Sequence, residues 1–184
     1  ADVLAEAIDH CRAVLPDTVT LQTSGFEGDS KLTEDLPIKV DETGMKQVIT
    51  NLVNNAADAM DNKGTIKVSL DPMDIQQGDQ NADQLKPGSY ALIAVADDGD
   101  GMDEETKNSL FEPFFTTKPV GEGTGLGLAT VYGIVNEWNG TIKVESKKGE
   151  GSTFKIYIPK SEEEVASLKP NDDVIIYVPH VGKR

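Results

Sequence analysis

Two amides lie one helical turn apart in a strongly periodic segment. Asn51 and Asn55 are four residues apart, so their side chains project from the same flank of a helix. A carboxamide offers an oxygen to a hard cation or an NH₂ group to a phosphate. Taken alone, the pair is more typical of a solvated polar face than of a binding site.

An acidic turn, Asp-Asp-Gly-Asp-Gly, begins at Asp97 directly after an apolar run. A carboxylate at a strand end can accept a hydrogen bond from an exocyclic amine, and Gly99 and Gly101 would let the backbone approach a ligand closely. A plain acidic turn is an equally good reading. A calcium loop is not supported, because the twelfth position is Asn108 rather than Glu and a strand precedes the turn.

A third feature is the sequence Gly-Glu-Gly-Thr-Gly-Leu-Gly-Leu at residues 121–128, which leads into a predicted helix. Alternate glycines free several backbone N–H groups for an anion, and the start of the helix adds its positive end. The spacing fits neither a Walker motif nor a Rossmann turn. Phosphate binding is nevertheless favoured over a flexible linker.

Two further motifs flank this region. Upstream, Phe-Glu-Pro-Phe-Phe-Thr-Thr-Lys at residues 111–118 ends in Lys118, which offers a charge to phosphate; a local hydrophobic contact is the simpler reading of its aromatics. Downstream, Gly-Glu-Gly-Ser-Thr-Phe at residues 149–154 is typical of a hairpin turn, and the hydroxyl of Thr153 could reach a ligand.

The elements that must position these residues follow from hydrophobic periodicity. Long polar connections are expected at residues 25–35, 71–88 and 112–127, and the second and third are expected to be mobile. Strands mixed with helices predict an α/β fold, a two-layer α/β sandwich with a mixed sheet packed against helices. The pattern predicts helices at 1–15, 41–60, 104–111 and 128–138, and strands at 19–23, 36–40, 65–70, 89–96, 141–145 and 154–158.

Composition narrows the class of protein. The chain has 184 residues and a net charge of −15, which predicts one domain with a tail and argues against binding nucleic acid or an anionic membrane. The single Cys11 excludes an internal disulfide and suits a reducing cytosol. No apolar run reaches the roughly 18–20 residues that span a bilayer. The chain starts without Met in the middle of a helical pattern, so we expect a fragment of a longer protein.

In their order along residues 1–159, the five motifs resemble the ATP-binding catalytic domain of sensor histidine kinases, in the superfamily that also contains gyrase, Hsp90 and MutL. The resemblance implies a Bergerat-type ATP-binding fold and Mg²⁺-ATP as the ligand. It implies a kinase-like domain at residues 1–160. Residues 161–184 are then a tail of unassigned role, expected to form an added strand or a linker.

The resemblance also implies roles for the matched residues. Asn55 is similar to the family's magnesium ligand, Asn51 would line the phosphate site, and Lys118 would touch phosphate; these three are the expected catalytic residues. Asp97 would read the adenine amino group, and Thr153 would support that contact through water. The remaining ATP-binding residues implied are Gly99 and Gly101 near the adenosine, and Gly123, Thr124, Gly125, Leu126 and Gly127 in a mobile lid over the triphosphate.

The sequence departs from the family pattern at two places. Asp58 and Ala59 stand where many members carry a basic residue and an aromatic, so phosphate charge must be met by magnesium, Lys118, lid amides or a partner chain. Asn51 stands where the superfamily ATPases carry a Glu that activates water, and an amide cannot act as a general base. Transfer to a protein acceptor is therefore favoured over efficient hydrolysis.

The histidines do not fit the family's phosphoacceptor. Neither His10 nor His180 is followed closely by an acid, so the acceptor is expected on a separate, histidine-bearing dimerisation domain of the same kinase. The resemblance further implies a downstream response regulator, a homodimeric full-length protein and a cytoplasmic location, including the cytoplasmic part of a membrane-bound sensor, with no membrane contact by this segment. Two alternatives stay open: an ATPase whose lid drives conformational change, and a nucleotide-responsive interaction module without transfer activity.

Overall fold

The computed structural model describes residues 2–25, 36–78, 85–119, 121–162 and 173–178. Its helices and strands begin and end within two residues of those predicted, apart from the two differences given below. The helices are α1 (Asp2–Val14), α2 (Glu42–Ala59), α3 (Glu104–Ser109) and α4 (Gly127–Glu137). The strands are β1 (Val19–Ser24), β2 (Leu36–Asp41), β3 (Gly64–Ile75), β4 (Gly88–Asp97), β5 (Thr141–Ser146), β6 (Ser152–Pro159) and β7 (Asp173–Val178).

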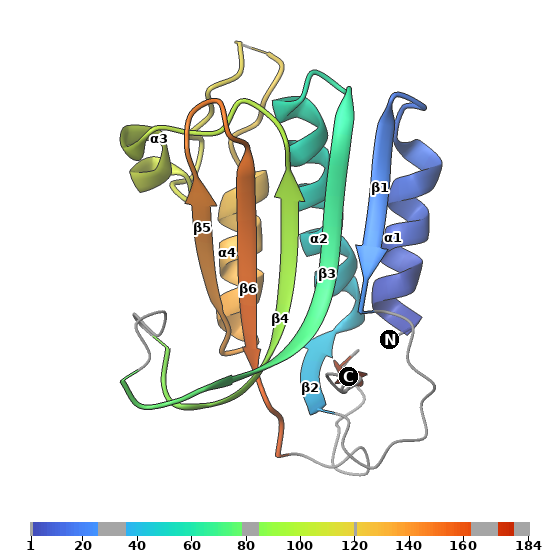
Figure 1. The fold of residues 1–184 in the computed structure, drawn as a ribbon, viewed down its shortest axis with the longest axis vertical. Coiled ribbons are helices and arrows are strands. Elements are labelled where there is room, and N and C mark those ends of the chain that lie inside the picture. The colour runs from blue at the N-terminus through green and yellow to red at the C-terminus, as the bar shows by residue number, and fades with distance from the viewer. Residues whose placement is uncertain (1, 26–35, 79–84, 120, 163–172, 179–184) are drawn as a thin grey trace.

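The main sheet has five strands in the order β1-β3-β4-β6-β5. Strand β1 is parallel to β3 and the other pairs are antiparallel, so the sheet is mixed. Helices α1, α2 and α4 lie side by side on one face of it (Figure 1). The predicted two-layer α/β sandwich is therefore confirmed.

The core lies between this sheet and α2. Alternate residues of the central strands are buried against the helix layer, as the two-residue repeat of a strand requires. Helix α2 buries one stripe at the expected helical spacing. Its first turn is capped by Asp41, whose carboxylate accepts the N–H of Gly44 and also the indole N–H of Trp138 at 2.9 Å. This indole contact joins the end of α4 to the start of α2.

The predicted long connection at residues 71–88 is wrong at both ends. Strand β3 continues to Ile75 and β4 begins at Gly88, with pairing unbroken from Ile66 opposite Asp97 to Ile75 opposite Gly88. The extension is stabilised by a second apolar cluster, which lies on the sheet face away from the helices because its members alternate with core residues. That cluster comprises Ile75, Leu85, Tyr90, Leu92 and Tyr157. Residues 79–84 of the predicted mobile connection, and 26–35 of the one before it, lie outside the described residues.

The apolar part of the tail is an added strand. Strand β7 pairs antiparallel with β2, from Asp173 opposite Asp41 to Val178 opposite Leu36. Ile176 and Val178 are buried in the same core as the main sheet. Helices long and apolar enough to cross a membrane do not occur in the part of the chain that the structure describes.

Candidate functional site

One flank of α2 carries the two amides and an acid. Asn51, Asn55 and Asp58 follow each other at four- and three-residue steps, so they lie in a row along the helix. The Nδ2 of Asn51 donates to the carbonyl oxygen of Gly127, the first residue of α4, at 3.3 Å. The carboxylate of Asp58 forms an ion pair with the ammonium group of Lys118. Asn55 is half-buried between these two contacts.

The segment between α3 and α4, which we call the lid (residues 112–126, of which 120 is not described), closes on itself near this flank. The N–H of Phe114 donates to the carbonyl oxygen of Gly125 at 2.8 Å. Gly125 has a φ of +65°, and a Cβ there would collide with the backbone of Phe114. A side chain at this position would therefore push the two arms of the lid apart.

Other residues of the lid pack around Lys118. Its backbone N–H donates to Oγ1 of Thr116 at 3.1 Å. A Cβ on Gly123 would lie 2.7 Å from the same oxygen and 3.1 Å from the Cδ of Lys118, so a glycine lets the lid pack closely around the lysine. Thr124 accepts the N–H of the exposed Leu126 at 3.3 Å.

The start of α4 has no side-chain cap. Leu126 occupies the N-cap position and makes no capping hydrogen bond with its side chain. The first N–H groups of an α-helix have no partner within the helix, and together with the helix dipole they favour an anion. This helix start contacts Asn51 of α2, so Gly127, the last of the predicted phosphate-binding glycines, lies beside one of the two predicted amides.

Asp97 lies at the end of β4, partly buried. Its carboxylate accepts the backbone N–H of Gly99 at 2.9 Å and that of Ser152. Burial raises the pKa of Asp97 above its ordinary value, and the charge of Asp98 adds to this, while the two N–H donors favour the ionised form and oppose it.

The turn that follows Asp97 packs against the last turn of α2. The N–H of Asp100 donates to the carbonyl oxygen of Ala59 at 3.1 Å, and a Cβ on Gly99 would lie 2.5 Å from that oxygen. The acid is thereby placed next to the helix end that carries Asn55. In Figure 1 the end of β4, the end of α2 and the start of α4 all lie at the upper end of the molecule.

The structure does not bring the side chain of Thr153 to Asp97. Asp97 is the register partner of Ser152, while Thr153 pairs with Ala96. Successive side chains of a strand point to opposite faces, so Thr153 lies on the face away from the helices and Ser152 on the helix side. Ser152 is the hydroxyl residue beside the acid, and it is 6% exposed. The sequence could have indicated Ser152, because this serine stands one position before Thr153 in the same glycine motif.

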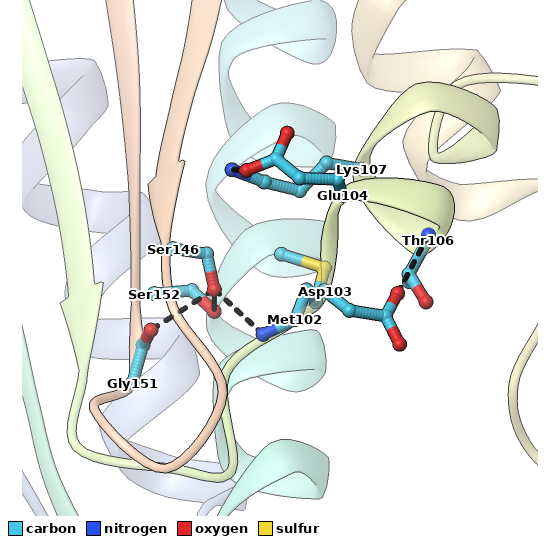
Figure 2. Close-up of polar contacts among 8 residues, drawn as sticks. All are labelled: Met102, Asp103, Glu104, Thr106, Lys107, Ser146, Gly151 and Ser152. Carbon is cyan, nitrogen blue, oxygen red and sulfur yellow. Dashed lines mark hydrogen bonds and ion pairs between the residues drawn. The ribbon is translucent and has the colours of Figure 1, made fainter.

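The sequence did not indicate that Ser146, a second serine, would contact the residues around Asp97. The hydroxyl of Ser146, at the end of β5, contacts Ser152, Gly151 and Met102, as Figure 2 shows. Of the two histidines, His10 is exposed on α1, and His180 lies outside the described residues.

Known proteins share both the sequence and the fold. Residues 40–162 match the family model described as histidine kinase-, DNA gyrase B-, and HSP90-like ATPase. The chain is 41% identical over 131 residues to sensor kinase CckA of Brucella abortus (strain 2308), which covers 70% of this chain and 14% of that protein. It is 32% identical over 156 residues to sporulation kinase C of Bacillus subtilis (strain 168), with 85% and 33% covered.

Among solved structures, the fold is similar to the catalytic domain of histidine kinase ThkA in a nucleotide-free form. The TM-score is 0.65 at 28% identity, over 86% of this chain and 91% of that one. The chain therefore spans a third or less of the two curated relatives but nearly all of a solved catalytic domain.

Proposed function

We propose that this chain presents the γ-phosphate of Mg²⁺-ATP to a histidine on a separate segment. The chain belongs to the family of histidine kinase-, DNA gyrase B- and HSP90-like ATPases, and it is an ATP-binding catalytic domain of the sensor histidine kinase type. One observation carries the proposal. A partly buried acid, a row of amides and an uncapped helix start converge at one end of the sheet.

We assign the adenine end of the site to Asp97. Its carboxylate accepts the exocyclic amino group of adenine, which guanine does not offer at the equivalent position. Ser152 replaces Thr153 as the hydroxyl residue that supports this contact, because Ser152 lies beside the acid. Gly99 and Gly101 allow the backbone to approach the adenosine.

The phosphate end is assigned to α2, the lid and the start of α4. Asn51, the backbone N–H groups around residues 123–127 and Lys118 bind the triphosphate, and Lys118 must leave Asp58 to do so. The amide oxygen of Asn55 suits magnesium, which takes few protein ligands and is completed by phosphate and water oxygens. When bound, the ion neutralises charge that develops on the phosphates during transfer.

The chemistry is then a matter of positioning and charge. A nitrogen of the acceptor histidine attacks the γ-phosphorus, the bond from that phosphorus to the β,γ-bridging oxygen breaks, and ADP leaves. Asn51 points its NH₂ group at Gly127 and cannot take a proton from water, which supports transfer over hydrolysis. The proposed partners are a histidine-bearing dimerisation domain of the same kinase, within a homodimer located in the cytoplasm, and a downstream response regulator.

The test uses ATP labelled at the γ-phosphate. The chain alone should remain unlabelled and hydrolyse ATP slowly. With the histidine-bearing segment of its own kinase added, that segment should gain an acid-labile, base-stable label. Labelling of His10 in the isolated chain would show that the acceptor is not separate, and rapid steady hydrolysis would favour the ATPase alternative.

A further inference from the structure

Two turns interlock beside Asp97. We call residues 97–102 the glycine turn and residues 146–152 the hairpin turn. The N–H of Gly149 donates to the carbonyl oxygen of Asp100 at 2.6 Å. A Cβ on Gly101 would collide with the carbonyl of Lys147, and one on Gly151 would collide with the carbonyl of Asp97. The turns therefore touch through their backbones, and small shifts of one must be followed by the other.

The hydroxyl of Ser146 lies where the two turns meet (Figure 2). It accepts the N–H of Met102 from the glycine turn at 2.8 Å. It donates to the carbonyl oxygen of Gly151 in the hairpin turn at 3.0 Å, and its oxygen is 2.9 Å from Oγ of Ser152. A hydroxyl has one hydrogen and two lone pairs, so it can donate to Gly151 and accept from Met102 and Ser152 at once. The hydrogen and both lone pairs of this hydroxyl then have partners.

This contact bears directly on the acid. The carboxylate of Asp97 takes one N–H from each turn, that of Gly99 and that of Ser152. If the turns separated or slid, at least one of these bonds would lengthen and the carboxylate would rotate. The Ser146 hydroxyl joins the residue after the glycine turn's second glycine to the residue before Ser152. Besides the carboxylate of Asp97 itself, this hydroxyl is a side-chain group that bonds to the backbone of both turns.

We propose that Ser146 is a positioning residue of the nucleotide site, which holds the Asp97 carboxylate in the orientation that selects adenine. The inference rests on the proposed function, since it assumes that Asp97 reads the base. Ser146 itself touches neither base nor phosphate in this scheme. Its effect is on the choice of base, because it fixes the direction of an acceptor.

The test compares ATP and GTP affinities by titration calorimetry for the wild-type chain, Ser146→Ala and Ser146→Thr. The wild type should prefer ATP at least about tenfold. Ser146→Ala should lose roughly three- to tenfold in ATP affinity with less than about twofold change for GTP, since one part-buried hydrogen-bonding group is removed. Ser146→Thr keeps the hydroxyl and should restore the preference.

A matched control is Ser89→Ala, which removes a serine hydroxyl bound to Asp74 at 2.6 Å near the opposite end of the sheet. This variant should keep the wild-type preference for ATP even if its melting temperature falls. A merely structural role for Ser146 would lower stability in Ser146→Ala without changing the ratio of the two affinities, and that result would overturn the inference.

Failure of the proposed function can be distinguished from failure of the inference about Ser146. A wild type that binds both nucleotides equally would remove the role of Asp97 and the basis of the inference with it. A measurement on the wild type alone covers the case in which Ser146→Ala does not fold. Without nucleotide, the Met102 amide should exchange its hydrogen slowly, because Ser146 accepts it. Exchange of Met102 at the rate of an unstructured peptide would contradict the proposal.

Discussion

The carboxyl group of Asp97 is partly buried by the protein itself, and this makes its charge unfavourable for folding. Burial raises the pKa of its carboxyl above the ordinary 3.8, so the native state binds this proton more tightly than the unfolded state. The stability that the group contributes is therefore full below pH 3.8 and is lost as the pH rises through the raised pKa. We predict that the stability of Asp97→Asn relative to the wild type increases as the pH rises from 3.8 through the raised pKa of Asp97 and is constant above it, as measured by thermal melts.

The same substitution should weaken ATP binding by about 1.5–3 kcal/mol, roughly 10–100-fold, because a charge-assisted bond is lost. Asp98→Asn is the control, since it removes a neighbouring exposed carboxylate that accepts the N–H of Thr65 instead. Calorimetric titration with ATP checks both variants. Unchanged affinity in Asp97→Asn would disprove the adenine contact, and a stability difference independent of pH would disprove the burial argument.

Asn55 should matter only when magnesium is present. We predict that Asn55→Ala abolishes phosphoryl transfer and weakens ATP binding about tenfold with Mg²⁺, and that wild type and variant bind alike in EDTA, because the amide oxygen contacts the ion. Asn54→Ala, one position earlier and exposed, provides the control. If EDTA leaves wild-type binding unchanged and Asn55→Ala matches it, the metal role is wrong.

Local patterns, a strand end and a helical spacing, draw attention to Asp97 and Asn55, and their roles are implied by the resemblance of the ordered motifs to the kinase family. That resemblance assigns the hydroxyl role to Thr153, and the structure places Ser152 beside the acid. The reason is that a hairpin's register depends on how its turn closes, and a shift of one residue moves a side chain to the other face. Ser146 could not be predicted, since its partners come from two turns far apart in the chain.

At the scale of elements, an ion pair between Lys118 and Asp58 joins the lid to α2, and under the proposed function this pair competes with phosphate. Lys118 forms an ion pair with Asp58, and both side chains are about a third or more exposed. Exposed pairs contribute only about 0–1 kcal/mol. We predict that Asp58→Asn raises ATP affinity about two- to fivefold, because Lys118 is released and a negative charge is removed, with little change in melting temperature.

Hydrogen exchange provides a second measurement for the same variant. Lid amides should exchange faster in Asp58→Asn than in the wild type without ATP, and both should gain protection when ATP is added. Asp61→Asn, just beyond the end of α2, is the charge-matched control. A fall in ATP affinity in Asp58→Asn would show that the carboxylate helps the triphosphate rather than competing with it.

Gly125 tests whether the closed shape of the lid is needed. We predict that Gly125→Ala weakens ATP binding and transfer about tenfold, because its Cβ collides with the backbone of Phe114. Gly78→Ala is a matched control, since Gly78 has a φ of +91° but open space around it and lies away from the site. Equal effects of the two variants on ATP binding would show that backbone strain alone is responsible.

The elements themselves were largely predictable, and the exception is informative. The apolar stripe of helix α2 is clear in the sequence, whereas the pattern of residues 71–75 predicts a loop and the structure shows a strand there. Those residues include two Asp and a Pro, and Ile75 is buried in the apolar cluster on the face away from the helices, which also contains Tyr90 and Tyr157. Contacts that form across strands of a sheet leave no local pattern in the sequence.

At the scale of the whole molecule, β7 completes the core. Ile176 is buried in the main core, as the register partner of Ile38 on β2, although it lies outside the segment that resembles the family. We predict that Ile176→Ala lowers the free energy of unfolding by about 2–5 kcal/mol, as measured by urea denaturation. Ile175→Ala, at the less buried neighbouring position, should cost clearly less. Equal and small effects would show that β7 does not pack.

The indole of Trp138 has a practical consequence. It is the chain's single tryptophan, it is buried, and it is bonded to the carboxylate at the start of α2. It lies at the far end of α4 from the lid. Its fluorescence should therefore stay constant when the lid closes and change only when the contact between α2 and α4 opens. An unlabelled sample thus carries its own optical probe of global unfolding, with which a variant that fails to bind nucleotide can be separated from one that fails to fold.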